Sequence, residues 1–123
     1  MPAHPLAAAL QLLIGLSLLN VWVVRAGGST AYRGGAAQSL RQEFAVYGLP
    51  DAAFYVVGAL KVLAGVILIA GLWLEMPVAL AASVVAALML GAIAMHYRMK
   101  DPLKKSVPAA VLLTLCIALL LVR

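Results

Sequence analysis

One lysine, Lys61, lies inside an otherwise uncharged apolar stretch, VVGALKVLAGVILIAGLW, at residues 56–73. In a membrane-spanning helix a central lysine costs roughly 2.5–3.5 kcal/mol on insertion scales, so such residues are functional candidates by default. Lys61 also follows Asp51 by ten residues, about 15 Å at helical rise, and its flexible stem can bring the ammonium group to the interface. Two interpretations are open: a role in binding or proton-linked chemistry, and snorkelling without a specific role.

Four further polar residues flank the apolar stretches at the same end: Asn20, Arg25, Glu43 and His96. With Lys61 they could line a polar pocket for a quinone, a lipid headgroup or a small polar ligand. Lys61 and Arg25 would be its cationic donors. Glu43 would be the counter-ion, and His96 would carry protons. The structural alternatives are that Asn20 only forms a hydrogen bond between helices and that His96 only belongs to the membrane interface.

A complete active site is not visible in the sequence. The only cysteine, Cys116, excludes an intramolecular disulfide and a CxxC redox centre, and the two histidines give no clustered metal site. Glycine-rich phosphate loops and the GxSxG nucleophile pattern are absent. We therefore expect no metal site, no intrinsic cofactor and no self-sufficient enzyme, while a quinone or a lipid stays open as a ligand.

The elements that must position these residues are membrane helices. Of the 123 residues, 66% are hydrophobic and 11% are charged. Several apolar runs reach the roughly 20 residues that cross about 30 Å of hydrocarbon, and the alternation that β-barrel strands require is missing. We predict an all-α membrane protein, a four-helix antiparallel bundle that forms a single membrane domain over residues 1–123. The spans are expected at about 6–24, 52–74, 76–97 and 107–122.

Basic residues are distributed unevenly along the chain. They concentrate in the two longer connections, at Arg25, Arg33 and Arg41 and at Arg98, Lys100, Lys104 and Lys105. By the positive-inside rule these connections are predicted to face the cytoplasm and both termini the outside, in a bacterial inner membrane. Topology and anionic lipid also explain the net charge of +5. We expect lipid and other membrane subunits or a second copy of the chain as partners, and no nucleic acid.

The first connection contains a predicted short helix at about residues 36–47. Leu40, Phe44 and Tyr47 recur at i, i+4 and i+7, and Gly48 supplies a helix stop. We predict an amphipathic helix at the membrane interface, with Tyr47 at the level of the lipid headgroups. It is either a simple anchor or a lid over the mouth of the bundle.

Small residues mark the predicted helix-packing faces. Gly58 and Gly65 are seven residues apart, so they share one side of the second span with Lys61. In the third span a ridge of small residues recurs every four positions, at Ala79, Ser83, Ala87 and Gly91. Such a ridge lets another helix approach closely, so we predict that the third span is a central helix. The alternative is chance spacing in an alanine-rich segment.

The YGLP turn, the VVGALKVLAGVIL helix and the MLGAIAMH end of the third span resemble the DoxX-like family of small four-helix membrane proteins. The resemblance extends over most of the chain and implies that fold. Similar proteins commonly have an acidic residue, usually glutamate, where this chain has Lys61, so no role of that carboxylate is carried over. The family takes its name from the membrane subunit of an archaeal thiosulfate:quinone oxidoreductase. The resemblance implies links to redox homeostasis, respiratory assemblies and membrane-protein assembly rather than one reaction.

Three functions follow from these expectations. We favour a non-catalytic accessory or structural subunit of a larger membrane complex, with a redox or quinone link. The first alternative is a carrier or binding protein for a small molecule, an anion or a lipid, which uses the polar pocket around Lys61. Because no span contains an acidic residue, a multidrug cation exporter is not expected. The second alternative is a quinone-linked oxidoreductase module that needs a partner.

Overall fold

The computed structural model describes residues 4–24, 27–28, 32–35 and 37–123. In these ranges four long helices form a bundle without β-strands. They are α1 with its continuation η1 (Pro5–Leu19 and Asn20–Val24), α3 (Asp51–Ala70), α4 (Val78–Arg98), and α5 (Val107–Val122) with the preceding turn η2 (Leu103–Ser106). Each is long and apolar enough to cross a membrane. The predicted all-α, four-helix membrane fold is confirmed.

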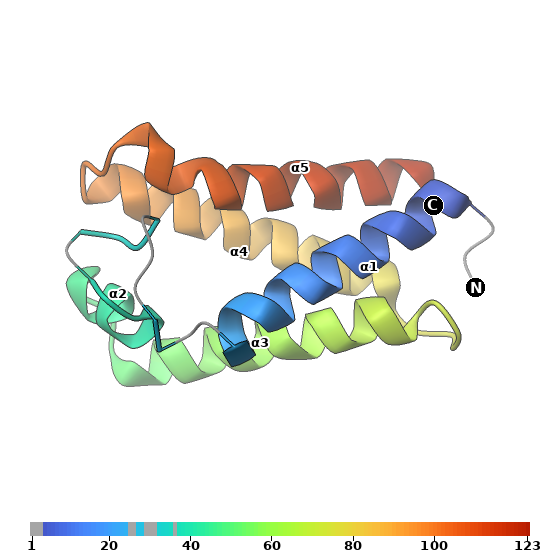
Figure 1. Ribbon diagram of the computed structural model, residues 1–123, viewed down its shortest axis with the longest axis horizontal. Helices are drawn as coiled ribbons and strands as arrows, with labels where there is room; N and C mark the ends of the chain where they lie inside the picture. The colour runs from blue at the N-terminus through green and yellow to red at the C-terminus, as the bar shows by residue number, and fades with distance from the viewer. Residues whose placement is uncertain (1–3, 25–26, 29–31, 36) are drawn as a thin grey trace.

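The long helices pack in a ring in which α1 and α4 each lie beside both α3 and α5. Figure 1 shows the termini and the α3–α4 turn at one end of the bundle, and α2 with the α4–α5 connection at the other. We call these the terminal end and the loop end. α1 runs obliquely, so that its N-terminal part lies near α5, whereas toward the loop end it follows α3 and leaves α5 (Figure 1).

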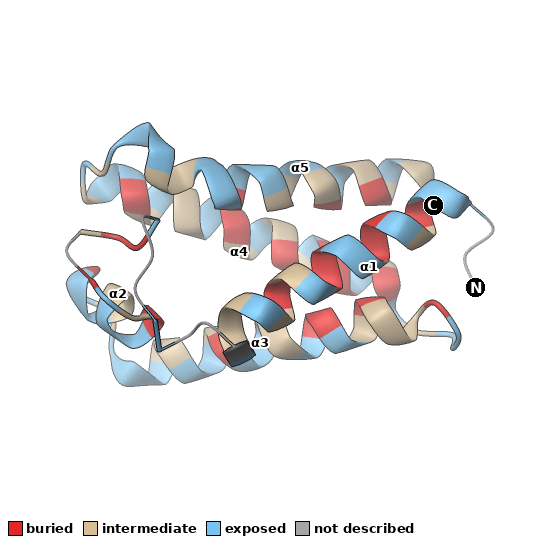
Figure 2. Ribbon diagram, viewed as in Figure 1, coloured by how far each residue is buried: buried red, intermediate tan, exposed pale blue. Residues whose placement is uncertain are grey.

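Large apolar side chains lie on the outer surface of the bundle as well as in its core. Ile14 and Val85 are 0% exposed, whereas Leu13 and Leu80 are 51% and 64% exposed. Figure 2 shows the same division along every long helix, with buried residues on the inner side. A large apolar side chain on an outer face has no water to avoid when that face contacts lipid hydrocarbon. The burial pattern therefore agrees with helices that are solvated by a membrane.

α1 and its continuation η1 approach α3 closely at three glycines. A Cβ atom added at Gly15 would lie 2.6 Å from the Cγ1 atom of Ile69 and 2.9 Å from the carbonyl oxygen of Gly65. A Cβ atom added at Gly58 would lie 2.6 Å from the ring of Trp22 in η1. Gly58 and Gly65, both selected from the sequence, thus face α1 and its continuation. Close backbone approach of this kind provides the van der Waals contact that holds helices together in lipid.

The ridge on α4 does not pack against the other helices of the chain. Ser83, Ala87 and Gly91 are exposed, and nothing lies within 4 Å of a Cβ atom added at Gly91. α4 packs instead through a neighbouring face that includes Val85 and Met89. The prediction that this span is central is wrong, because the ring gives each long helix two neighbours. Ala79, at the start of the ridge, is partly buried.

Replacing Gly15 by alanine is expected to destabilise the bundle by about 1–3 kcal/mol, because the added methyl group overpacks against the backbone of α3. Gly91→Ala is the matched control in the open part of α4. It should be neutral or stabilising by up to about 1 kcal/mol, because alanine has the higher helix propensity. Unfolding of both variants in mixed detergent micelles, followed by circular dichroism, measures the difference. Equal stability of the two variants would contradict the close crossing of α1 and α3.

The predicted helix of the first connection is present as α2 (Leu40–Val46), which is shorter than the predicted range. It begins after Ser39, whose side chain accepts a hydrogen bond from the N–H of Gln42. Its apolar face packs against the bundle: Leu40 and Tyr47 are each 6% exposed. The ring of Tyr47 is buried edge-on against His96 of α4, and its position at the level of the lipid headgroups stays a prediction.

Candidate ligand-binding cavity

A cavity of about 440 Å³ lies inside the loop end of the bundle, and we call it the lysine cavity. All four long helices and the first connection contribute to its walls. Among its polar lining residues are Asn20, Glu43, Lys61 and His96. The structure therefore brings together four of the five ligand-binding residues chosen from the sequence. The fifth, Arg25, lies outside the described residues.

Lys61 enters the lysine cavity from α3. Its ammonium nitrogen lies 5.2 Å from the ring centroid of Trp22, a cation–π contact worth about 0.5–2 kcal/mol. No carboxylate in the described ranges lies within ion-pair distance of Lys61, and Glu43 attracts it only from farther away. The cation–π contact offsets part of the free-energy cost of placing a charged side chain in a spanning helix. Lys61 thus presents an unpaired positive charge to the cavity.

Trp22 contacts Lys61 from η1, the π-helical turn in which α1 continues. Its indole ring lies over Gly58, where the missing side chain leaves room. The ring also contacts Phe44 of α2 and Phe54 of α3, at centroid distances of 6.0 and 5.4 Å. These three aromatic side chains, which we call the aromatic cluster, connect α1, α2 and α3 beside Lys61.

The carboxylate of Glu43 interacts with Tyr47, His96 and Arg33 rather than with Lys61. Its Oε1 atom accepts a hydrogen bond from the Tyr47 hydroxyl at 2.8 Å and lies 4.0 Å from His96 Nε2, and its Oε2 atom lies 3.7 Å from Arg33. Burial and this carboxylate raise the pKa of the Tyr47 phenol above its ordinary value, so the hydroxyl stays protonated and donates. Because these groups share the charge of Glu43, it does not neutralise Lys61.

The end of α4 brings Asp101 to His96. Lys100 adopts the left-handed conformation, with φ at 56°, and the N–H of Asp101 donates to the carbonyl oxygen of His96. This turn places Asp101 Oδ2 2.8 Å from His96 Nδ1, which donates to it. The N–H of Gly35 donates to Asp101 Oδ1 at 3.1 Å, and Lys105 donates to the carbonyl oxygen of Gly35 at 2.6 Å. Asp101 therefore anchors the first connection to the α4–α5 connection.

Asp101→Asn is expected to loosen this anchor. Burial alone would raise the pKa of Asp101, but hydrogen bonds from His96 and Gly35 and the charge of Lys105 hold it below its ordinary value. A lowered folded pKa stabilises the folded chain above the unfolded value of about 3.9, and the contribution is lost as pH falls through the folded pKa. We expect lower protection of residues 37–47 against hydrogen exchange in the variant at neutral pH, and a smaller further loss of protection on acidification than in the wild type.

Asp51→Asn is the matched control for this experiment. Asp51 pairs with Arg41 at 2.7 Å, but both side chains are more than half exposed, so the pair contributes little. Equal exchange rates in the two variants would contradict the role of Asp101 as an anchor.

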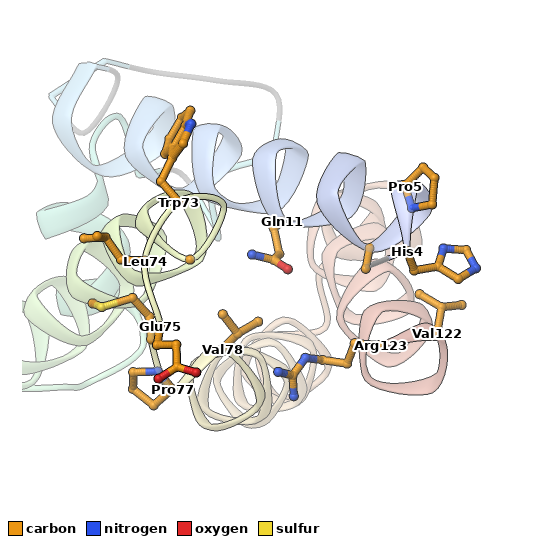
Figure 3. Close-up of a pocket in the computed structure, with 13 residues that line it drawn as sticks. His4, Pro5, Gln11, Trp73, Leu74, Glu75, Pro77, Val78, Val122 and Arg123 are labelled. Atoms are coloured by element: carbon orange, nitrogen blue, oxygen red, sulfur yellow. The ribbon is translucent and has the colours of Figure 1, made fainter. Parts of the chain in front are cut away.

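A second cavity, of about 1010 Å³, lies at the terminal end among α1, the α3–α4 turn and the end of α5. Figure 3 shows Gln11 directed into it from α1, with Arg123 on the opposite side. Gln11 is only 2% exposed, and its Nε2 atom donates to the carbonyl oxygen of Leu68 at 3.0 Å. Its Oε1 atom has no hydrogen-bond donor within the described ranges. We call this space the glutamine cavity; sequence reasoning missed it because one amide in an apolar span gives little signal.

The walls of the lysine cavity combine cationic side chains with apolar ones. The described residues that line it include three cations, Arg33, Lys61 and Lys105, and the carboxylate of Glu43; Asp101, behind this lining, lies 3.9 Å from Lys105. Apolar side chains from α1, α4 and α5 form much of the remaining wall. In the part of the chain that the structure describes, no three His, Cys, Asp or Glu side chains are grouped as metal ligands. The arrangement fits a molecule with an apolar body and an anionic or electron-rich head.

Comparison with known families gives a match over most of the chain. The model of the DoxX-like family matches residues 17–119, which include every residue that lines the lysine cavity. Gln11 and Arg123 of the glutamine cavity lie outside the matched range. No curated protein and no solved structure matches the chain.

Proposed function

The chain belongs to the DoxX-like family, and from this premise we propose that it is a membrane protein that binds an anionic amphiphile in the lysine cavity. The head of this ligand is a phosphate or a carboxylate, and its body is apolar. Lys61 carries the proposal, because its ammonium group faces the cavity without an ion-pair partner in the described ranges. An anionic head would supply that partner.

The surroundings of Lys61 favour an anion over a cation. Arg33 and Lys105 add positive charge to the same walls, and Glu43 already interacts with Arg33 and Tyr47. An anionic head would accept a charge-assisted hydrogen bond from Lys61, worth about 1.5–3 kcal/mol. A neutral quinone head offers only carbonyl acceptors, so it is the second ligand chemistry that this cavity would take.

The apolar tail would leave the cavity between α1 and α5. Leu18 of α1 and Leu112 of α5 both line the lysine cavity, at the end where α1 departs from α5 (Figure 1). A tail along these side chains would remain in contact with apolar surface and with lipid. A free anion would gain the contact with Lys61 but not this burial.

Tryptophan fluorescence can test the binding proposal, because Trp22 lies beside Lys61. The chain has two tryptophans, so a Trp73→Phe variant leaves Trp22 as the only indole fluorophore. We expect its emission to change saturably as phosphatidylglycerol replaces phosphatidylcholine in lipid nanodiscs that hold the protein. Inorganic phosphate should act weakly, since it lacks a tail. A response to a short-tailed ubiquinone alone would reassign the ligand, and no response to any of these would contradict the proposal.

We also propose that the loop end faces the cytoplasm of a bacterial cell and the terminal end faces outward. Support comes from the basic residues of the two connections, Arg33, Arg41, Lys100, Lys104 and Lys105 among them. Modification of single cysteines introduced at Lys104 and at Glu75 into a Cys116→Ser background, by a membrane-impermeant reagent on intact cells, tests this. Modification is expected at position 75 and not at position 104.

A second candidate function is that of a non-catalytic subunit in a larger membrane complex. The outward ridge of Ser83, Ala87 and Gly91 favours it, because these small residues are exposed and no helix in the described ranges covers them. Close approach along such a ridge would suit a helix of another subunit or of a second copy. Ala87→Leu should then weaken co-purification of the partner without changing the stability of the chain. A quinone or redox link of that complex stays a prediction from the family resemblance.

A further inference from the structure

The lysine cavity and the glutamine cavity lie at opposite ends of the same bundle, and one buried layer separates them. On α1, Leu18 lines the first cavity, Gln11 lines the second, and Ile14 lies between them on the same face. Buried side chains of α3, α4 and α5 belong to the same apolar core as Ile14. We call the layer the apolar barrier; its side chains, each 0% exposed, are Ile14, Leu68, Val85, Cys116 and Leu119.

The apolar barrier is thin compared with a bilayer. Leu18 and Gln11 are seven residues apart on α1, which is about 10 Å at helical rise. Leu112 and Val122, which line the two cavities on α5, are ten residues apart, or about 15 Å. The hydrocarbon of a membrane is about 30 Å thick. A polar head that has entered either cavity therefore has half of that thickness or less left to cross.

Each cavity presents a polar side chain of a spanning helix at its inner end. In the lysine cavity this is Lys61. In the glutamine cavity it is Gln11, whose Oε1 atom has no donor among the described residues and whose amide points into the space that Arg123 also faces (Figure 3). Glu75 lines the same cavity, so that its charges are mixed. Polar side chains inside a membrane are costly, and they characteristically mark the paths of polar solutes.

We propose that the bundle is a path along which the anionic head of a phospholipid crosses from one leaflet to the other, between Lys61 and Gln11. This inference rests on the proposed binding of an anionic amphiphile in the lysine cavity. The head moves through the apolar barrier while the tail stays in the surrounding lipid. The exchange is passive and runs in both directions, so it needs neither a covalent step nor an energy source.

A quenching assay measures this exchange directly. The full chain is reconstituted into vesicles of phosphatidylethanolamine and phosphatidylglycerol that contain a trace of phosphatidylglycerol with a fluorescent nitrobenzoxadiazole group on one tail. Dithionite added outside destroys the fluorophores of the outer leaflet. Protein-free vesicles should retain the inner-leaflet signal, whereas vesicles with the protein should lose nearly all of it.

Gln11→Leu separates the path from the binding site. The variant extends the apolar barrier toward the terminal end, so the inner-leaflet signal should be retained as in protein-free vesicles. The Trp22 response to phosphatidylglycerol, measured in the Trp73→Phe background, should persist and reports that the bundle is folded. Ser17→Ala is the matched control on α1, because Ser17 donates to the carbonyl oxygen of Leu13 and lines neither cavity; it should behave as the wild type.

Ile14→Ser provides a test in the opposite direction, because it places a hydroxyl group inside the apolar barrier. It should increase the rate at which the inner-leaflet signal is lost. This variant keeps the path testable if Gln11→Leu fails to fold.

The possible results distinguish the two proposals. A wild-type chain that binds phosphatidylglycerol but leaves the inner-leaflet signal intact would overturn the path and leave the binding function standing. A chain that gives no Trp22 response would overturn the binding function itself. Folded Gln11→Leu with wild-type exchange would show that lipid does not cross through the glutamine cavity, and it would overturn the assigned path.

Discussion

Lys61→Met is expected to weaken binding of phosphatidylglycerol by about 10- to 100-fold, because one charge-assisted hydrogen bond of about 1.5–3 kcal/mol is lost. Methionine has an unbranched stem of similar length, so the aromatic cluster and the cavity walls should keep their packing. The Trp22 titration with phosphatidylglycerol measures the loss. Lys61→Arg keeps the positive charge and should retain most of the affinity.

The same substitution should make the protein more stable. A lysine inside a spanning helix costs roughly 2.5–3.5 kcal/mol on insertion scales, and an apolar residue removes that cost. Unfolding in mixed micelles should therefore require more denaturing detergent for Lys61→Met than for the wild type. This opposition between stability and binding is expected of a residue retained for function.

Lys100→Gln is the control for a general effect of charge. Lys100 is exposed in the α4–α5 connection and does not line the lysine cavity. If Lys100→Gln and Lys61→Met reduce binding equally, the ligand responds to overall surface charge, and the assignment of Lys61 is incorrect. If neither substitution affects binding, Lys61 snorkels to the membrane interface and has no specific role in binding.

Trp22→Ala is expected to destabilise the bundle by about 3 kcal/mol, at the lower end of the range for aromatic-to-alanine changes. Trp22 contacts Phe44 of α2 and Phe54 of α3 and also covers Gly58. Its removal leaves a void where these elements meet, and Lys61 loses its cation–π contact. Detergent unfolding gives the stability loss, and hydrogen exchange of residues 40–46 shows whether α2 is released.

Trp73→Ala is the matched control for the tryptophan substitution. Trp73 is 71% exposed on the α3–α4 turn, so its truncation should change stability by only a few tenths of a kcal/mol. Trp22→Phe should restore most of the stability, because a ring remains against Phe44 and Phe54. Exchange of α2 at the wild-type rate in Trp22→Ala would contradict the view that the aromatic cluster holds it in place.

The fold was predictable from the sequence because a bilayer leaves few choices. Long apolar runs must form helices whose backbone hydrogen bonds are internal, and short connections make neighbouring helices antiparallel. Lys61, Glu43 and His96 could be grouped because helical rise gives each a depth, and residues of similar depth at one end of a small bundle lie near one another. The depth of a residue does not tell which way its side chain points from the helix axis. For this reason the sequence predicted that the ridge on α4 packs inside the bundle, whereas it faces outward.

The remaining parts of the candidate site depend on geometry that a single sequence does not contain. Asp101 reaches His96 only because Lys100 takes a left-handed conformation, which favours glycine and is uncommon for lysine. Gly35 meets Asp101 across 66 positions of chain. In the sequence, Arg33 and Lys105 look like ordinary charged residues of the two connections. Only the folded structure shows that they line the lysine cavity.

The anchor between the two connections also determines when the lysine cavity becomes complete. Gly35 is joined to Asp101 and Lys105, which are synthesised 66 and 70 residues later. Because a chain is made from its N-terminus, α1, α2 and α3 exist before these partners do. Through that interval the cavity lacks the walls that α4 and α5 supply, and Lys61 is accessible from the membrane. The lysine cavity is therefore completed last, when α4 and α5 supply their walls and the first connection is fixed in place.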